Sequence, residues 1–372
     1  MASISNQFVF GIEDDLISID AILNEFLFIQ PEKLLVVADG GINPQGSILS
    51  DVSHKTNISY YRVPSGEPTT DEADNLTEFI RREEPGVIVA IGGGSTIDLA
   101  KAGTVLANES TSLKASDLQG KTLTSRRNNF LIAIPTTCGA GAEATKSAVL
   151  TNSHKKIKRG INSQSALPNV VVLDAELLST LPQSVKNSSF LDALTHSIES
   201  NIGIKRNLMS DMFSQSAFRV LVGMVEDPKG FAIENKSALV ASHFAGKAIC
   251  NSETGPVHAL SYYLSEELSI PHGVAVGVLL PEVIDYYVTR CGVSLRFASI
   301  LPNSELDRFL KQIRELAFSL LSENMYKSIL ELDIEKASVR SMQLTGAINN
   351  APITWNPNKS KDVYQKLISF LR

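Results

Sequence analysis

The chain of 372 residues lacks several features that mark specialised proteins. Its three cysteines lie far apart and without C-x-x-C spacing, which argues against a disulfide framework or a thiolate metal site and fits a reducing compartment. No stretch approaches the roughly 20 uninterrupted apolar residues of a membrane span. The beginning, MASISNQFVFGIEDD, has no cationic region followed by an apolar one. We therefore expect a soluble, cytoplasmic protein that is not exported.

An excess of positive charge is also missing. The chain has 34 Lys and Arg against 40 Asp and Glu, a net charge of −6. Nucleic acid or an anionic membrane would favour a clustered cationic face, so we expect a small-molecule partner instead. The length exceeds what one hydrophobic core usually supports, which predicts about two domains. The oligomeric state is left open, a homodimer included.

What is present in the first half is an alternation of short β-branched runs with helix-length polar stretches. The runs are LLVVA, ISYYRV, VIVAI, FLIAIP and VVVLD. Runs that are apolar on both faces predict a parallel sheet covered by helices on both sides. Ligands of such sheets bind at the carboxyl ends of the strands, so functional residues are expected just after each run.

The second half changes period. Segments such as SFLDALTHSIESNI, SALVASHFAGKAICN and DRFLKQIRELAFSLLSEN carry apolar residues three and four apart, as amphipathic helices do. We therefore predict a dinucleotide-binding α/β domain over residues 1–182 and a helical, metal-binding domain over residues 183–372.

A glycine-rich turn follows the run VIVAI. Three glycines precede a predicted helix, with Ser95 or Thr96 as its cap. Glycines let the backbone approach a pyrophosphate, whose charge is met by free amide N–H groups and the positive end of the helix dipole. Because the pattern is GGGS and not G-x-G-x-x-G, a tight structural turn is an equal alternative.

Other strand ends carry further candidates. Asp39 ends the first strong strand, where a carboxylate can accept hydrogen bonds from ribose hydroxyls and repels the extra phosphate of NADP, which favours NAD. A turn role ahead of two glycines is the alternative for Asp39. Thr136 and Thr137 follow FLIAIP and suit contact with cofactor phosphates. Cys138, beside them, is interpreted as a bystander because no histidine is near it in the sequence.

A metal site is predicted in the second half. Asp192 and His196 are four residues apart in a helical stretch, so both side chains leave the same face. His258 follows later, and Pro271 breaks the intervening helix so that His272 can point back. Three imidazoles and a carboxylate suit Zn²⁺ or Fe²⁺. A single buried histidine is more often a core residue, but three histidines and an aspartate together favour a metal. The other histidines, His54, His154 and His243, lack this context.

In combination these motifs resemble the iron-containing alcohol dehydrogenase family. GGGSTIDLAKA, PTTCGAGAEAT, DALTHSIE, GPVH, PHGV and WNPNKSKDVYQKL occur in the family's order over nearly the whole chain. The resemblance implies a Rossmann-like domain followed by a helical one, the dehydroquinate synthase-like architecture, with metal ligation by Asp192, His196, His258 and His272. It also implies NAD-binding positions, with Asp98 near the nicotinamide and Asp39 at the ribose; the others are Gly93, Gly94, Ser95, Thr136, Thr137, Thr145, Lys158 and Leu177.

One position departs from the family pattern. Four residues after His258, where many members carry a second histidine for substrate contact or proton relay, this chain has Tyr262. Tyr262 in its SYYLS context, together with the KKIKRGIN stretch, resembles the branch that oxidises the terminal alcohol of the sugar acid Kdo, 3-deoxy-D-manno-octulosonate. The alternatives are a packed aromatic for Tyr262 and a solvated turn for the cations Lys155, Lys156, Lys158 and Arg159.

The sequence thus predicts a metal- and NAD-dependent oxidoreductase. A bound metal would act as a Lewis acid on the substrate oxygen, and hydride would pass between the carbon of a primary alcohol or aldehyde and the nicotinamide, with Tyr262 as catalytic residue. Two other classes stay open: a sugar-phosphate cyclase or lyase of the dehydroquinate synthase type, and a non-catalytic NAD-binding protein. The intact set of four metal-ligand candidates favours the dehydrogenase.

Overall fold

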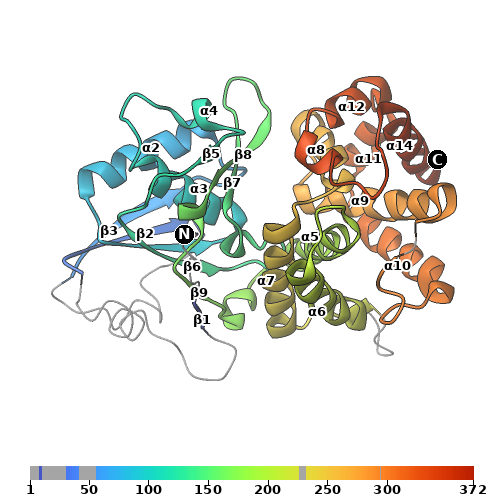
Figure 1. Cartoon of the computed structure of the whole chain (residues 1–372), viewed down its shortest axis with the longest axis horizontal. Coiled ribbons are helices and arrows are strands. Elements are labelled where there is room, and N and C mark those ends of the chain that lie inside the picture. Colours follow the sequence, from blue (N-terminus) through green and yellow to red (C-terminus); the bar gives the residue numbers. More distant parts are fainter. Residues whose placement is uncertain (1–7, 11–30, 42–55, 226–231, 294) are drawn as a thin grey trace. The chain divides into compact units, whose positions relative to one another are not determined.

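The computed structural model describes residues 8–10, 31–41, 56–225, 232–293 and 295–372 (Figure 1). Most of MASISNQFVFGIEDD, and His54, lie outside the described residues. The chain divides into two compact units. The first comprises Met1–Thr137 and Ala142–Ser179, and the second comprises Cys138–Gly141 and Thr180–Arg372. The change of unit at residues 179 and 180 lies close to the change of hydrophobic period in the sequence.

The first unit is built on a parallel sheet, as the sequence predicts (Figure 1). Every strand pair in it is parallel. In spatial order its strands are β1 (Phe8–Phe10), β9 (Val170–Val172), β6 (Phe130–Pro135), β4 (Val87–Gly92), β2 (Lys33–Asp39) and β3 (Asn57–Val63). Side chains of β2, β4, β6 and β9 pack into one apolar core, which includes Leu34, Val36, Val89, Ile132 and Val170.

One predicted strand differs from the others in burial. ISYYRV was expected to be apolar on both faces, but β3 is the edge strand of the sheet and most of its side chains are partly or fully exposed. Tyr60, for example, is exposed, whereas Val36, its partner in register, is buried. An edge strand has a neighbour on one side only, which explains the polar residues within this run.

Helices connect the parallel strands. α2 (Thr70–Glu83) begins with a capping box in which the Thr69 hydroxyl accepts from the N–H of Glu72 while the Glu72 carboxylate accepts from the N–H of Thr69. α3 (Gly94–Leu106) follows β4 and is buried along most of its length. The short helix α4 (Ala115–Leu118) lies between α3 and the next strands.

A second, smaller sheet was not predicted. It consists of β5 (Thr122–Leu123), β8 (Lys158–Ser163) and β7 (Ser147–Thr151), with β7 and β8 antiparallel. The interpretation of the KKIKRGIN cations as a solvated turn is therefore wrong for Lys158, which opens β8 and is buried. Lys155, Lys156 and Arg159 are exposed. The polar composition of β8 hid its strand character.

The second unit is helical, which confirms the prediction for residues after Pro182 (Figure 1). Its long helices are α5 (Gln183–Ile202), α6 (Leu208–Val225), α7 (Asn235–Ser252), α8 (Pro256–Leu268), α9 (His272–Asp285), α10 (Leu306–Ser319) and α14 (Pro357–Leu371). Shorter helices are α11 (Glu323–Leu330), α12 (Ile334–Ser341) and α13 (Thr345–Ile348). Among the described residues, no helix combines the length and apolar composition needed to cross a bilayer.

Candidate metal centre and cofactor loops

Helix α5 supplies two of the predicted metal ligands. Asp192 and His196 are four residues apart in its central part, where every side chain from Phe190 to Ile202 is buried. One helical turn separates them, so the carboxylate and the imidazole project from the same face. The local sequence therefore places half of the site without help from the rest of the fold.

The other two ligands come from helices α8 and α9. His258 is the third residue of α8, which opens with Gly255 as N-cap and Pro256 in the first turn. His272 is the first residue of α9, after the N-cap Pro271. Proline fits a helix start because its missing N–H would have no partner there. Both histidines thus stand in the first turn of a helix.

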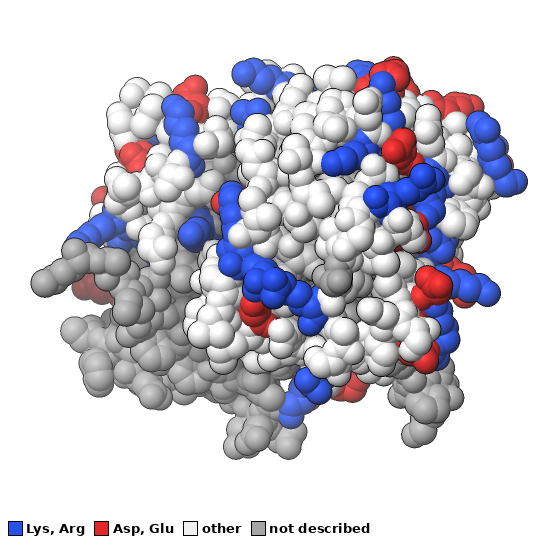
Figure 2. All heavy atoms as spheres, turned by 45° about the vertical axis from the view of Figure 1, so that its right-hand side comes forward, with Lys and Arg blue, Asp and Glu red and all other residues white. Residues whose placement is uncertain are grey.

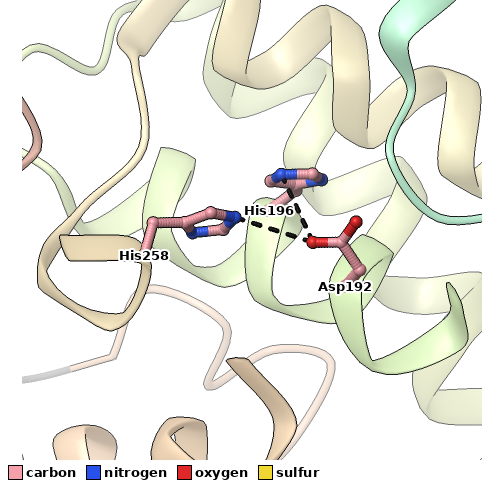
Figure 3. A group of neighbouring side chains, drawn as sticks. All are labelled: Asp192, His196 and His258. Carbon is pink, nitrogen blue, oxygen red and sulfur yellow. Dashed lines mark ion pairs between the residues drawn. The ribbon is translucent and has the colours of Figure 1, made fainter. Parts of the chain in front are cut away.

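The three histidines converge on one carboxylate oxygen. Nε2 of His196 and Nε2 of His258 each lie 3.6 Å from Oδ1 of Asp192, and Nε2 of His272 lies 3.7 Å from the same atom. Figure 3 shows the first two imidazoles pointing at the carboxylate. The rings of His196 and His258 are stacked, with centroids 4.7 Å apart. The structure therefore brings together all four residues that the sequence selected.

Burial and charge separate the four ligands. The side chains of Asp192, His196 and His258 are 5–7% exposed, whereas that of His272 is 27% exposed. Burial alone would raise the pKa of the Asp192 carboxyl, but the neighbouring imidazoles outweigh burial and hold this pKa well below its usual range. Burial lowers the pKa of His196. For His258 burial also acts downward, but Glu199 and Asp192 raise its pKa to about 9.

The arrangement fits a divalent metal ion. Asp192 Oδ1 and His258 Nε2 are buried without a hydrogen-bond partner, because their separation exceeds hydrogen-bond length. A tetrahedral site with metal–ligand bonds of about 2.1 Å has ligand–ligand edges of about 3.4 Å, close to the separations observed. Buried polar atoms left without partners are costly, and a cation between them removes that cost.

Two further residues lie around this centre: Tyr262, which the sequence selected, and Glu199, which it did not. The ring of Tyr262, one turn after His258, meets the ring of His272 edge-on with centroids 5.9 Å apart. Glu199 received no role from the sequence, yet its carboxylate contacts Nδ1 of His258 at 2.6 Å. Its position seven residues after Asp192, on the same face of α5, is the signal that could have identified it.

In the first unit, the glycine-rich turn lies between β4 and α3. The prediction of Ser95 or Thr96 as helix cap is wrong: the N-cap is Gly93, the helix begins at Gly94, and no side chain caps it. The first N–H groups of α3 are thus left to other partners. A Cβ on Gly93 would lie 3.2 Å from Cγ2 of Thr137, so a larger residue would crowd the turn. These are the features that a pyrophosphate needs.

The loop after β6 joins this turn. The N–H of Thr136 donates to the carbonyl of Gly92, which places Thr136 and Thr137 beside the glycines, as predicted from the strand ends. Thr145 lies further along and its hydroxyl contacts Nζ of Lys101, a fully buried ammonium. The same ammonium holds Oδ1 of Asp98 at 2.9 Å, while Oδ2 of Asp98 accepts from the N–H of Val149.

The remaining cofactor candidates lie at other places in the first unit. Lys158 is 2.8 Å from the carboxylate of Glu67, a partner that the sequence did not reveal. Leu177 packs against the core of the sheet. Asp39 ends β2, and its Oδ1 accepts from the N–H of Gly41 at 2.9 Å. That bond supports the turn role for Asp39 and leaves its second oxygen for a ribose, so both interpretations of Asp39 fit. Contact of these residues with NAD stays a prediction.

Comparison with known proteins adds to this geometry. Residues 9–175 match the iron-containing alcohol dehydrogenase family, and residues 187–365 match the C-terminal region of the Fe-containing alcohol dehydrogenase family. Alcohol dehydrogenase 4 of Saccharomyces cerevisiae is 31% identical over 262 residues, which cover 68% of this chain and 67% of that protein. The chain belongs to the iron-containing alcohol dehydrogenase family.

Other known proteins are similar to this chain to different extents. A 4-hydroxybutyrate dehydrogenase of Clostridium kluyveri is 33% identical over 230 residues, and the match spans only 61% of that protein's length and 60% of this chain. Among solved structures, an iron-containing alcohol dehydrogenase from Thermococcus thioreducens superposes with a TM-score of 0.80 at 23% identity, covering 98% of both chains. Sulfoacetaldehyde reductase from Bifidobacterium kashiwanohense, solved with NAD⁺, gives 0.79 at 24% identity over 98% of this chain and 96% of that one. These structural likenesses confirm the predicted fold class, a parallel-sheet domain followed by a helical domain.

Proposed function

We propose that the protein is a metal-dependent alcohol dehydrogenase that transfers hydride between NAD and the carbon of a primary alcohol or aldehyde. The observation that carries the proposal is the convergence of three imidazole nitrogens on one oxygen of Asp192. Membership of a family described as iron-containing alcohol dehydrogenases supports the reaction class. Either Fe²⁺ or Zn²⁺ suits the ligand set of three nitrogens and one carboxylate oxygen.

In the proposed reaction an alcohol carbon gives a hydride to NAD⁺ and the hydroxyl gives up a proton, which yields an aldehyde and NADH. A bound divalent metal supplies Lewis acidity that makes the hydroxyl easier to deprotonate. Asp192, His196 and His258 would hold the metal from a buried position, and the more exposed His272 would complete the set. Tyr262, whose ring contacts that of His272, is the residue we propose for relaying the hydroxyl proton to solvent, because a phenol can accept one hydrogen bond while it donates its own proton.

NAD is the proposed cofactor, bound in the first unit. The uncapped N-terminus of α3 and the adjacent Thr136 and Thr137 supply N–H and hydroxyl groups for a pyrophosphate. The remaining oxygen of Asp39 is proposed to accept from the ribose, which disfavours NADP. The NAD⁺ complex of the Bifidobacterium kashiwanohense reductase, a protein of the same fold, is consistent with this choice.

For the substrate, we propose an anionic or polyhydroxylated primary alcohol, with the sugar acid Kdo as the leading candidate. Tyr262 and the exposed cations Lys155, Lys156 and Arg159 motivate this choice; the ammonium of Lys158, in the same stretch, is paired with Glu67. The names of two similar proteins, a 4-hydroxybutyrate dehydrogenase and a sulfoacetaldehyde reductase, also denote anionic substrates. A third, the 1,3-propanediol dehydrogenase of Klebsiella pneumoniae, is named for a neutral one.

The proposal includes a small-molecule partner and a cytoplasmic location, without binding to nucleic acid or membrane. On the face of the molecule in Figure 2, acidic and basic side chains lie interspersed. Such mixing, together with the net charge of −6, disfavours a polyanionic partner.

The test is the absorbance of NADH after protein loaded with Fe²⁺ without oxygen, or with Zn²⁺, is mixed with NAD⁺ and a set of alcohols. The set comprises Kdo, 4-hydroxybutyrate, 1,3-propanediol and ethanol, each also tried with NADP⁺. We expect metal-dependent NADH formation, fastest with an anionic alcohol. Formation with ethanol or 1,3-propanediol but not with the acids would contradict the substrate proposal.

The matched variants are His258→Ala and His243→Ala. Both histidines are buried in helices of the second unit, but only His258 belongs to the metal group. We expect His258→Ala to lower kcat/KM by about 1,000-fold or more, because losing a ligand forfeits several kcal/mol of charge stabilisation. His243→Ala should stay within about tenfold. In a separate assay with sugar phosphates as substrates, consumption without net NADH would indicate the cyclase class. NAD binding without turnover of any substrate would indicate a non-catalytic protein.

A further inference from the structure

Glu199 is a buried carboxylate in the second unit whose contacts reach beyond its own helix. It follows Asp192 by seven residues and His196 by three on α5, so all three side chains share one face of the helix. It is 2% exposed. A carboxylate this far from water needs strong hydrogen-bond donors.

The donors all come from the first turn of α8. Oε2 of Glu199 accepts from the N–H of Gly255 at 2.8 Å and contacts Nδ1 of His258 at 2.6 Å, and Oε1 accepts from the N–H of Val257 at 2.6 Å. α8 has no side-chain cap of its own, so Glu199 serves as its cap from a neighbouring helix. The contact is close: a Cβ on Gly255 would lie 2.8 Å from Oε1.

The contact with Nδ1 decides what the other ring nitrogen of His258 can do. An ionised carboxylate only accepts hydrogen bonds, so Nδ1 must carry the proton that it donates. In the neutral imidazole, which is the form that binds a metal, Nε2 then keeps its lone pair. Nε2 is the atom that lies 3.6 Å from Oδ1 of Asp192 among the metal-ligand candidates. Because the two backbone bonds fix the carboxylate, the ring plane of His258 is fixed as well.

We infer that Glu199 is a positioning residue that holds His258 in the tautomer and orientation required for metal ligation, and that it thereby sets the metal affinity of the site. The inference rests on the proposed metal centre of Asp192, His196, His258 and His272. A carboxylate partner on a metal-ligating histidine orients the ring and increases its basicity. Glu199 is not itself a ligand, because its carboxylate contacts Nδ1 of His258, on the opposite side of the ring from the Nε2 atom that would bind the metal.

The variant that tests this is Glu199→Gln, which keeps the shape of the side chain. The carboxylate offers two acceptor oxygens to three donors, the N–H groups of Gly255 and Val257 and Nδ1 of His258, whereas the amide offers only one oxygen. With that oxygen in place of Oε2, the NH₂ group faces the N–H of Val257. In the reverse orientation the NH₂ group faces Nδ1 of His258 and forces the proton onto Nε2, which can then no longer bind a metal.

The matched control is Glu282→Gln. Glu282 on α9 is also fully buried in the second unit, but its carboxylate pairs with Arg314 at 2.7 Å and with no metal-ligand candidate. Zn²⁺ affinity is measured by competition with a chelator, the ligand set by the visible spectrum of the Co²⁺ form, and folding by the melting temperature of the metal-free protein.

We expect Glu199→Gln to weaken Zn²⁺ binding by about 10- to 100-fold and to change the Co²⁺ spectrum. Glu282→Gln should leave both unchanged, even where it lowers the melting temperature. Zn²⁺ affinity within threefold of the wild type and an unchanged Co²⁺ spectrum in Glu199→Gln would overturn the inference and leave Glu199 as a helix cap only. Wild-type protein that binds no Zn²⁺ would instead overturn the proposed metal centre, and the inference with it.

A second measurement keeps the inference testable where Glu199→Gln does not fold. In wild-type protein with ¹⁵N-labelled histidine, NMR distinguishes a protonated Nδ1 from a protonated Nε2. We expect His258, assigned by its absence from the His258→Ala spectrum, to carry its proton on Nδ1 in the Zn²⁺-loaded protein, with a strongly downfield proton shift from the short bond to Glu199. A His258 without a hydrogen-bonded Nδ1 proton would overturn the inference.

Discussion

Cys138 stands in the loop after β6, where a reactive thiol could be mistaken for a nucleophile. Its side chain is 1% exposed, and burial raises the pKa of the thiol to about 11. At pH 8 only about 0.1% would be thiolate, the reactive form. We expect iodoacetamide to modify the half-buried Cys250 and Cys291 well before Cys138, as followed by mass spectrometry. Cys138→Ala should retain activity within about threefold. A loss beyond 100-fold with intact metal binding would indicate that Cys138 is a nucleophile after all.

Asp39 offers a test of cofactor choice at a single side chain. Asp39→Asn keeps an acceptor for the N–H of Gly41 but removes the negative charge. Without that charge the extra phosphate of NADP is no longer repelled, so the ratio of kcat/KM for NADP to that for NAD should rise at least about tenfold, or about 1.4 kcal/mol. Initial rates with both cofactors measure this. An unchanged ratio, with an unchanged melting temperature, would leave Asp39 as a turn residue only.

Helix α3 depends on a buried ion pair as well as on its glycine-rich start. Lys101 is fully buried, and its ammonium binds Asp98 at 2.9 Å, the carbonyl of Ala142 at 2.8 Å and the hydroxyl of Thr145. These bonds tie α3 to the segment that precedes β7. The element thus owes its position to a charge that the apolar pattern of the sequence does not display.

Lys101→Met should therefore be strongly destabilising. It leaves the Asp98 carboxylate without its partner, which costs about 3–5 kcal/mol in the free energy of unfolding. The control is Lys114→Met, whose ammonium is 53% exposed and 3.9 Å from Asp74, and which should cost about 1 kcal/mol or less. Chemical denaturation measures both. If the pair is the cause, adding Asp98→Asn to Lys101→Met should recover part of the loss; equal costs for both single variants would contradict this account.

For the molecule as a whole, the proposed metal ligands lie in the second unit and the proposed NAD-binding residues in the first. We therefore expect the metal and NAD each to stabilise the folded protein independently of the other. A ligand at 100 times its Kd stabilises the folded state by about 2.7 kcal/mol. For units of 150–250 residues that corresponds to a rise in melting temperature of about 5–10 °C. We expect such a shift with Zn²⁺ and another with NAD.

Two variants separate these shifts. His258→Ala should lose the Zn²⁺ shift and keep the NAD shift. Ser95→Glu should lose the NAD shift and keep the Zn²⁺ shift, because a carboxylate in the first turn suits the dipole of α3 but repels a pyrophosphate. Differential scanning fluorimetry measures all four values. Loss of both shifts in either variant would show that the two effects are not separable.

The sequence by itself determined the features that depend on neighbours along the chain. The central strands were predictable because β-branched runs buried on both faces are typical of parallel sheets, and Asp192 with His196 because four residues make one helical turn. The fold class and the order of its two parts followed from the change of period. The ligand set was predictable from the four-residue spacing of Asp192 and His196, from Pro271 ahead of His272, and from the resemblance to the motifs of the family.

Only the tertiary structure decided what lies between residues distant in the chain. It brought Nε2 of His258 to Asp192, and Nδ1 of the same ring to Glu199, 59 residues away. It buried Lys158 against Glu67 in a sheet whose polar strand resembled a turn. Periodicity reports which face of an element is apolar, but a hydrogen bond or an ion pair depends on how elements pack, and one sequence does not encode that in any local pattern.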